Sequence, residues 1–206
     1  MAEILKSLED EYLKKWGFVI VRCTYSDEGK WDAFMSEIKK QTLGDLERNP
    51  APLATALKES LQWTIIEDRE NLDNATMLQA SLRFQEWTKT DGVQEIGIRF
   101  APAQRVEWAL ALYPRYTLYI YVDADAVESV VNPARAKELT GYYVTLVRLN
   151  INLIPEDDDD SEAPDESLRR IRADMLIAFY LAYMDINRWY DAWQAPPRVH
   201  GNGLFW

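Results

Sequence analysis

The sequence has one cysteine, Cys23, and one histidine, His200, among its 206 residues. A single cysteine excludes an intrachain disulfide and is typical of proteins from a reducing compartment. A single histidine excludes a metal site built from several histidines, and Ser-His or Cys-His catalysis would depend on a residue in the turn-rich segment 196–203. Cys23 itself lies in an apolar stretch, which favours a core residue over a nucleophile. We therefore assign no catalytic residue, no metal and no cofactor.

The chain also lacks a long apolar run and an excess of positive charge. No uninterrupted apolar stretch approaches the ~20 residues that span a bilayer, and the first residues are too acidic for a signal peptide. Acidic residues outnumber basic ones 34 to 23, which gives a net charge of −11. Such a surface repels phosphate groups, so we expect neither nucleic acid nor a membrane as partner. We expect a soluble, cytoplasmic protein, although a nuclear location fits these properties equally well.

Glycine-rich phosphate-binding loops are absent too, because neither G-x-G-x-x-G nor G-x-x-x-x-G-K-[ST] occurs. What the chain does have is a globular composition, with 48% hydrophobic and 28% charged residues. Its 12% of aromatic residues suits either a large aromatic core or an aromatic-lined pocket. The length is within the range of one domain, so we predict a single domain over residues 1–206.

The first third of the chain alternates between helical and strand patterns. Apolar residues at helical spacing predict an amphipathic helix over 3–15, and the β-branched run 18–25 predicts a central strand buried on both faces. Ser26 or Asp27 can cap a following helix with a stripe of buried side chains at Trp31, Phe34, Met35, Ile38 and Thr42. After a proline-containing segment and a short helix, a second strand is expected over 61–67.

The remainder is predicted to contain three further helices and three further strands. Asn74 is a candidate cap for a helix that runs to about Lys89 and ends at the turn Asp91-Gly92. The apolar residues of 104–112 fit the period of a helix and that of a strand equally well, so that segment is not assigned. Acidic segment 155–167 cannot bury apolar surface, so we expect a mobile loop there. The other expected elements are short strands at 96–100, 116–122 and 142–149, a short helix at 124–131 and a long helix over 168–189. This order favours an α+β fold with a mixed β-sheet covered by helices, and specifically a ferredoxin-like core with additions.

Three segments of the first two thirds of the chain stand out as a set. They are WGFVIVRCTY at 16–25 with Trp31 and Phe34 after it, WTIIED at 63–68, and PRY at 114–116 leading into YVD at 121–123. Together they resemble a group of uncharacterised proteins of filamentous fungi. The resemblance implies a fungal source, and it brings no catalytic residue with it because no activity is known for that group.

One charged residue interrupts the predicted central strand. Arg22 must find a partner if it is buried, because an unpaired buried charge is very costly. Glu67 or Asp68, at the end of the next strand, can supply one. The structural interpretation is a buried ion pair; the functional one is an anion-binding site at the strand ends, built from Arg22, Tyr25 and a further arginine such as Arg69 or Arg115. Residues Arg22, Tyr25, Glu67, Asp68 and Arg115 are thus the candidate ligand-binding residues.

Asp123 and Asp125 form a second candidate after strand 116–122. A D-x-D pair can bind a divalent cation through carboxylate oxygens. The segment Asp125-Ala126-Val127-Glu128 also has the pattern of a capping box, in which Asp125 caps the helix and Glu128 reaches back. We favour the capping interpretation because the sequence assigns no further carboxylate or histidine to this place.

Two classes of function remain open. We favour a non-catalytic binding or protein-interaction domain, because no nucleophile, base or metal cluster is recognisable. The alternative is a small enzyme or small-molecule-binding protein that uses carboxylates with Tyr and Arg side chains in an aromatic-lined pocket. The partner is then an unidentified protein or small molecule, and a homo-oligomer is compatible with either class. A pocket that contains Arg22, Tyr25 or Glu67 would favour the alternative.

Overall fold

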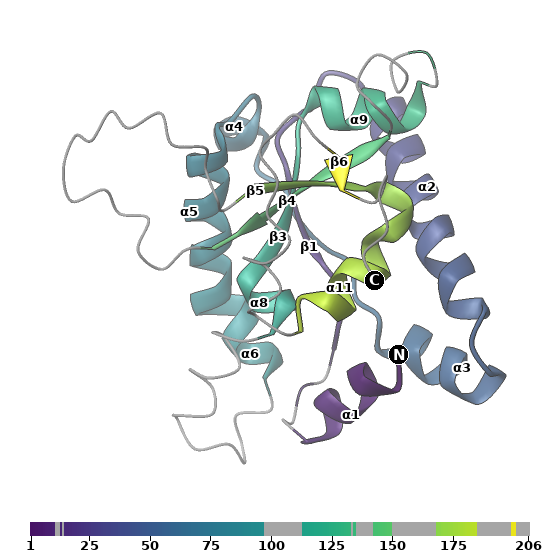
Figure 1. The fold of residues 1–206 in the computed structure, drawn as a ribbon. Coiled ribbons are helices and arrows are strands. Elements are labelled where there is room, and N and C mark those ends of the chain that lie inside the picture. Colours follow the sequence, from purple (N-terminus) through teal and green to yellow (C-terminus); the bar gives the residue numbers. More distant parts are fainter. Residues whose placement is uncertain are drawn as a thin grey trace.

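A computed structural model describes residues 1–10, 13, 15–96, 113–132, 134, 142–149, 168–184 and 199–200 (Figure 1). In these ranges six strands form one sheet in the order β2-β1-β3-β4-β5-β6. The strands are β1 (Val19–Arg22), β2 (Thr64–Ile66), β3 (Leu118–Val122), β4 (Tyr143–Arg148), β5 (Leu168–Arg172) and β6 (Val199–His200). The sheet is mixed and is covered by helices, which confirms the predicted α+β class.

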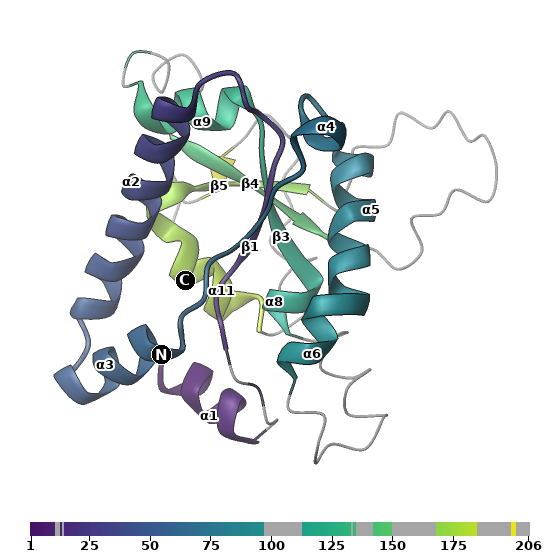
Figure 2. The ribbon, with the colours of Figure 1, turned by 180° about the vertical axis from the view of Figure 1, so that it is seen from behind.

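Helices surround the sheet on both faces (Figure 2). They are α1 (Ala2–Asp10), α2 (Glu28–Glu47), α3 (Ala51–Ser60), α4 (Arg69–Leu72), α5 (Met77–Trp87), α6 (Val93–Glu95), α8 (Pro114–Thr117), α9 (Ala124–Val131) and α11 (Leu176–Ala182). A π-helical segment, Thr88–Gly92, joins α5 to α6, and a 3₁₀ turn, Ala173–Met175, precedes α11. No helix within the described ranges is long and apolar enough to cross a membrane.

β1 lies inside the sheet, parallel to β2 on one side and to β3 on the other. Its four residues are buried, as we predicted for a central strand. From β3 onward the pairing changes, because β4 is antiparallel to β3 and β5 is antiparallel to β4. The ferredoxin-like core is not confirmed. Such a core is a β-α-β-β-α-β unit, whereas here β1 lies between β2 and β3 and is parallel to both.

Alternation along the strands divides the core into two layers. Phe18, Ile20 and Ile120 face α2, α9 and α11 on one side, where Trp31, Phe34 and Tyr180 meet them. Val19, Val21 and Tyr119 face α4 and α5 on the other side, where Phe84 and Trp87 meet them. The hydroxyl of Tyr119 also donates to the carbonyl of Met77 at 3.1 Å, which fastens α5 to the sheet. Three layers result, with the sheet in the middle.

The long helix predicted over 168–189 is wrong in its first part. Residues 168–172 form β5, and helix α11 begins only at Leu176. Arg169 and Ile171 are buried while Leu168, Arg170 and Arg172 are partly exposed, so burial alternates with the period of a strand. Pairing with β4 overrides the high helix propensity of leucine and arginine in this stretch.

Two helix boundaries also differ from the prediction. α1 ends at Asp10 rather than near residue 15, and Leu13 forms an isolated antiparallel bridge with Ile96. Asn74 does not cap α5. It adopts a positive φ of 56°, and Thr76 is the cap, in a capping box with Gln79.

Asp91-Gly92 does not end the helix either, because the chain continues through the π-helical segment into α6. Residues 97–100 of the strand predicted at 96–100, segment 104–112 and the predicted loop 155–167 lie outside the described residues.

Candidate functional site

The carboxyl ends of β2, β1 and β3 lie at the same edge of the sheet, because the three strands are parallel. The chain leaves β1 for β2 on one side and later enters β3 on the other, so the strand order reverses next to β1. In open α/β sheets ligands bind outside the carboxyl ends of the strands at such a switch point. This edge, where α2, α4 and α9 begin, is therefore the place to look for a site (Figure 1).

An aspartate follows each of the three parallel strands and caps the next helix. Asp27 accepts a hydrogen bond from the backbone N–H of Lys30 at 3.0 Å, which begins α2. Asp68 accepts from Asn71 at 3.2 Å and begins α4, and Asp123 accepts from Ala126 at 2.8 Å and begins α9. A helix N-terminus is a favourable place for an anion. Here the chain's own carboxylates already occupy all three positions.

Asp123, and not Asp125, is therefore the cap of α9, which corrects the predicted capping box. Asp125 lies one residue inside the helix, in its first turn. The helix itself spans the predicted residues 124–131. Within the described ranges no group of three or more His, Cys, Asp or Glu side chains is placed to hold a metal ion.

Arg22 is buried at the end of β1 and is paired, as we predicted. Its Nη1 donates to Glu67 Oε1 at 3.1 Å and its Nη2 donates to Glu28 Oε2 at 2.7 Å. The Nε donates to the carbonyl oxygen of Thr24 at 2.9 Å. Burial alone would lower the pKa of Arg22, but the hydrogen bonds to the two glutamates raise it overall.

Two aromatic rings enclose the same guanidinium. Its central carbon lies 4.4 Å from the ring centroid of Tyr25 and 4.5 Å from that of Trp31. Cation–π contacts of this kind are worth about 2 kcal/mol or more when they are desolvated. Two ring faces, a carbonyl oxygen and two carboxylates surround the guanidinium of Arg22, so its charge and its N–H groups are engaged by the protein's own residues. The anion-site interpretation of Arg22 therefore has no support in the geometry.

Tyr25 and Asp68 belong to the same cluster but do not pair with Arg22 by charge. The Tyr25 hydroxyl accepts a hydrogen bond from the backbone N–H of Asp68 at 2.9 Å, and Arg69 Nη2 donates to the Tyr25 carbonyl at 3.1 Å. Burial raises the pKa of Tyr25. These bonds join the end of β1 to the start of α4. Four of the five predicted site residues, Arg22, Tyr25, Glu67 and Asp68, are thus brought together.

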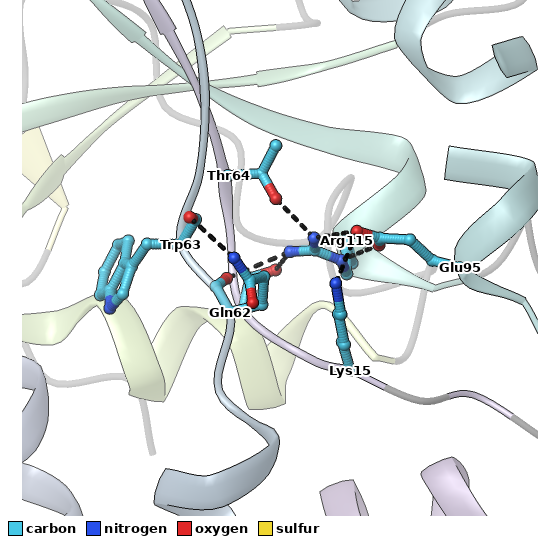
Figure 3. A network of polar contacts seen from close by, with 7 residues as sticks. Lys15, Gln62, Trp63, Thr64, Glu95 and Arg115 are labelled. Carbon is cyan, nitrogen blue, oxygen red and sulfur yellow. Dashed lines mark hydrogen bonds and ion pairs between the residues drawn. The ribbon is translucent and has the colours of Figure 1, made fainter. Parts of the chain in front are cut away.

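Arg115 lies at the opposite end of the parallel strands, so its predicted place in the site is wrong. It is 1% exposed and precedes β3, next to the segments that lead into β1 and β2. Figure 3 shows its guanidinium at the centre of a polar network. The Nε and Nη2 donate to Glu95 at 2.7 and 3.0 Å, while Nη2 also donates to Thr64 Oγ1 at 2.7 Å. Arg115 comes just before β3, and only the direction of β3 relative to β1 decides at which end of the sheet it lies.

The strand-end cluster leaves its negative charges facing the solvent. The side chain of Glu28 is 60% exposed and that of Glu67 is 50% exposed, whereas the side chain of Arg22 between them is 5% exposed. We call the carboxylates along this edge the acidic rim, consisting of Asp27, Glu28, Glu67, Asp68, Glu70 and Asp123. Nearby Lys30 forms an ion pair with Glu128 of α9. A positively charged group approaching this edge meets carboxylates at the end of every parallel strand.

Sequence reasoning missed Glu28 and Trp31 as members of the cluster. Both lie in the first turns of α2, six and nine residues after Arg22, and the spacing across a strand-to-helix turn gives no direct sign of contact. Trp31 was expected on the buried stripe of that helix, which is correct. A guanidinium has several N–H groups to satisfy when it is buried, and this requirement could have indicated that Arg22 has partners besides Glu67.

Cys23 lies one residue beyond β1 and is 1% exposed. Burial, together with the charge of Asp123, raises the pKa of its thiol to about 12. A protonated, inaccessible thiol is a poor nucleophile, which agrees with the prediction that Cys23 is a core residue.

Comparison with known proteins adds no relative to this picture. No protein-family model, no curated protein and no solved structure matches the chain, so its function has to be inferred from its own residues.

Proposed function

We propose that this protein is a non-catalytic, cytoplasmic interaction domain whose acidic rim binds a positively charged segment of a partner protein. The observation that carries the proposal is the set of aspartate caps Asp27, Asp68 and Asp123, one after each parallel strand, at the edge where such sheets bind ligands. Because carboxylates already fill the helix N-termini, that edge disfavours anions and favours lysine or arginine side chains.

The state of Arg22 supports the same interpretation. A buried cation at a ligand-binding edge would normally argue for an anionic ligand, but Glu28 and Glu67 overcompensate its charge. Both glutamates are about half exposed, so each can accept further hydrogen bonds from a partner while it remains paired. Charge-assisted hydrogen bonds to carboxylates are stronger than neutral ones.

The test measures the binding of a fluorescein-labelled peptide composed of lysine, arginine, serine and glycine. The rim variant Asp27→Ser with Asp68→Ser removes two negative charges, while serine still caps both helices. We expect this double variant to bind the peptide at least fivefold more weakly at low salt, with a shallower dependence of affinity on salt.

A matched control removes two exposed carboxylates elsewhere. Glu3→Gln with Asp91→Asn changes the net charge by the same amount, and neither residue is in the rim. Affinity within about twofold of the wild type is expected for this control. If the control weakens binding as much as the rim variant does, only net charge matters and the proposal is wrong.

A further inference from the structure

A groove lies at the other end of the molecule, between α1 and α3. Figure 2 shows the two helices side by side, below the amino ends of the parallel strands. The groove has a volume of about 440 Å³, which is within the size range of pockets that hold small molecules. It is lined by Leu5, Leu8, Glu9, Leu13, Ala56, Glu59 and Ser60.

The floor of the groove is apolar. Leu5 and Leu8 come from α1 and are half-buried, Leu13 follows that helix and is buried, and Ala56 comes from α3. The Ser60 hydroxyl donates to the carbonyl of Ala56 at 2.8 Å, so its hydrogen-bonding capacity is partly used within α3. Such a floor gains free energy when an apolar side chain covers it.

Two carboxylates flank this floor in an unfavourable electrostatic position. Glu9 lies in the last turn of α1 and Glu59 in the last turn of α3, where the negative ends of the helix dipoles disfavour acidic side chains. Both are exposed, and neither forms an ion pair with another residue in the described ranges. Lys58, in the same turn of α3, pairs with Glu47 instead, at 2.7 Å. The groove therefore combines an apolar floor with two exposed carboxylates that form no ion pair within the described ranges.

We propose that this groove docks an amphipathic segment of a partner protein, with one bulky apolar side chain on the leucine floor and a lysine or arginine beside each glutamate. The charge of the groove selects the cations, and its floor selects the apolar residue. A second copy of the chain is disfavoured as occupant because each copy carries a net charge of −11. The groove is separate from the acidic rim, which lies at the carboxyl ends of the parallel strands.

The test uses a fluorescein-labelled amphipathic helical peptide of about 12 residues, or three turns, with leucines on one face and lysines beside them. A second peptide replaces every leucine by serine and keeps the charge. The groove variant is Glu9→Lys with Glu59→Lys, and its control is Asp32→Lys with Asp91→Lys, which changes net charge equally with exposed residues outside the groove. Binding and thermal unfolding are measured for all three proteins.

The groove variant should bind the leucine peptide at least tenfold more weakly than the wild type, while the control stays within about threefold. Its melting temperature should equal or exceed that of the wild type, because lysine is favourable at a helix C-terminus. The serine peptide should bind the wild type at least tenfold more weakly than the leucine peptide does, because it cannot cover the apolar floor of the groove.

Two results would overturn the docking proposal. One is an equal affinity of wild type and groove variant for the leucine peptide, and the other is an equal loss in the control. Neither depends on the acidic rim, whose test uses other residues and a peptide without apolar side chains, so the two proposals can fail independently.

Discussion

Arg22 and Arg115 are buried arginines at opposite ends of the parallel strands, and the charge of each is stabilised in a similar way. Each places its guanidinium against an aromatic ring and surrounds it with carbonyl and carboxylate oxygens. They differ in the exposure of their carboxylates, because the side chain of Glu95 beside Arg115 is 14% exposed whereas Glu28 and Glu67 are at least half exposed. Arg115 is therefore enclosed in the fold, and the Arg22 cluster is the one that reaches the surface.

Replacing Arg22 by alanine should lower the free energy of unfolding by about 2 to 3 kcal/mol. The change leaves a void between the rings of Tyr25 and Trp31 and leaves two carboxylates without their cation. Urea unfolding followed by tryptophan fluorescence measures the loss. An unfolding midpoint equal to that of the wild type would show that this cluster contributes nothing to stability.

Glu67→Gln is the matched control for that experiment. The amide can keep one hydrogen bond to Arg22, and Glu28 still compensates the buried charge. Because Glu67 is half exposed, we expect this variant to lose less than about 1 kcal/mol. A loss as large as that of the alanine variant would place the stabilising interaction in the Arg22–Glu67 pair alone.

At the scale of single elements, helix α9 offers the clearest test of the capping arrangement. Asp123 accepts the backbone hydrogen bond at its start, whereas Asp125 lies inside the first turn. Asp123→Ala should therefore lower the free energy of unfolding by about 1 kcal/mol, and Asp123→Asn or Asp123→Ser should cost only a few tenths. Thermal unfolding followed by circular dichroism gives the comparison.

The corresponding Asp125 variants discriminate between the two carboxylates. Asp125→Ala removes a favourable charge near the helix N-terminus while the cap at Asp123 stays in place, so it should be less destabilising than Asp123→Ala. If the Asp125→Ala variant is the less stable of the two alanine variants, the assignment of the cap to Asp123 is wrong.

Elements with a strong local pattern were predictable from the sequence. The strands predicted around β1 and β3 and the boundaries of α9 are confirmed, because a β-branched strand buried on both faces and a helix buried along one stripe leave distinct periodicities. β5 was not predictable in this way. Its sequence LRRIR has good helix formers at four of its five positions, all except Ile171, and the pairing with β4 makes it a strand.

The candidate site was predictable in chemistry but only partly in geometry. A charge inside an apolar strand requires a partner, and this reasoning found the pairing of Arg22 with Glu67. It could not place Arg115, because the end of the sheet that a residue occupies depends on whether its strand runs parallel to β1. The acidic rim also escaped prediction, since its members come from three separate strand-to-helix turns.

For the molecule as a whole, alkaline pH should be destabilising. Burial raises the pKa of Cys23 to about 12, with a contribution from the charge of Asp123, and burial raises the pKa of Tyr121, Tyr180 and Tyr183 to about 12 as well. In the unfolded chain these groups ionise near pH 8.5 for the thiol and near pH 10 for the phenols. The stability that these neutral groups contribute is therefore fully present below about pH 8.5 and is lost as the pH rises toward 12.

The measurement is the urea midpoint at a series of pH values from about 7 to 10.5. The midpoint should stay level up to about pH 8.5 and then fall, and Cys23→Ala should remove the first part of the fall, before the phenols of the unfolded chain ionise. A midpoint that is constant over the whole range would mean that these groups ionise as easily in the folded protein as in the unfolded chain.

The position of β1 in the sheet has a consequence for biosynthesis. Val19 pairs with Tyr119, so about 100 residues separate the two strands at the centre of the sheet. At synthesis rates of roughly 5 to 20 residues per second, β1 has left the ribosome for about 5 to 20 seconds before β3 is complete. During that time one edge of an apolar strand is open to incorrect pairing. The nascent chain is thus most vulnerable in its first half, and chaperones that bind extended apolar segments should recognise residues 18–25 until β3 takes its place.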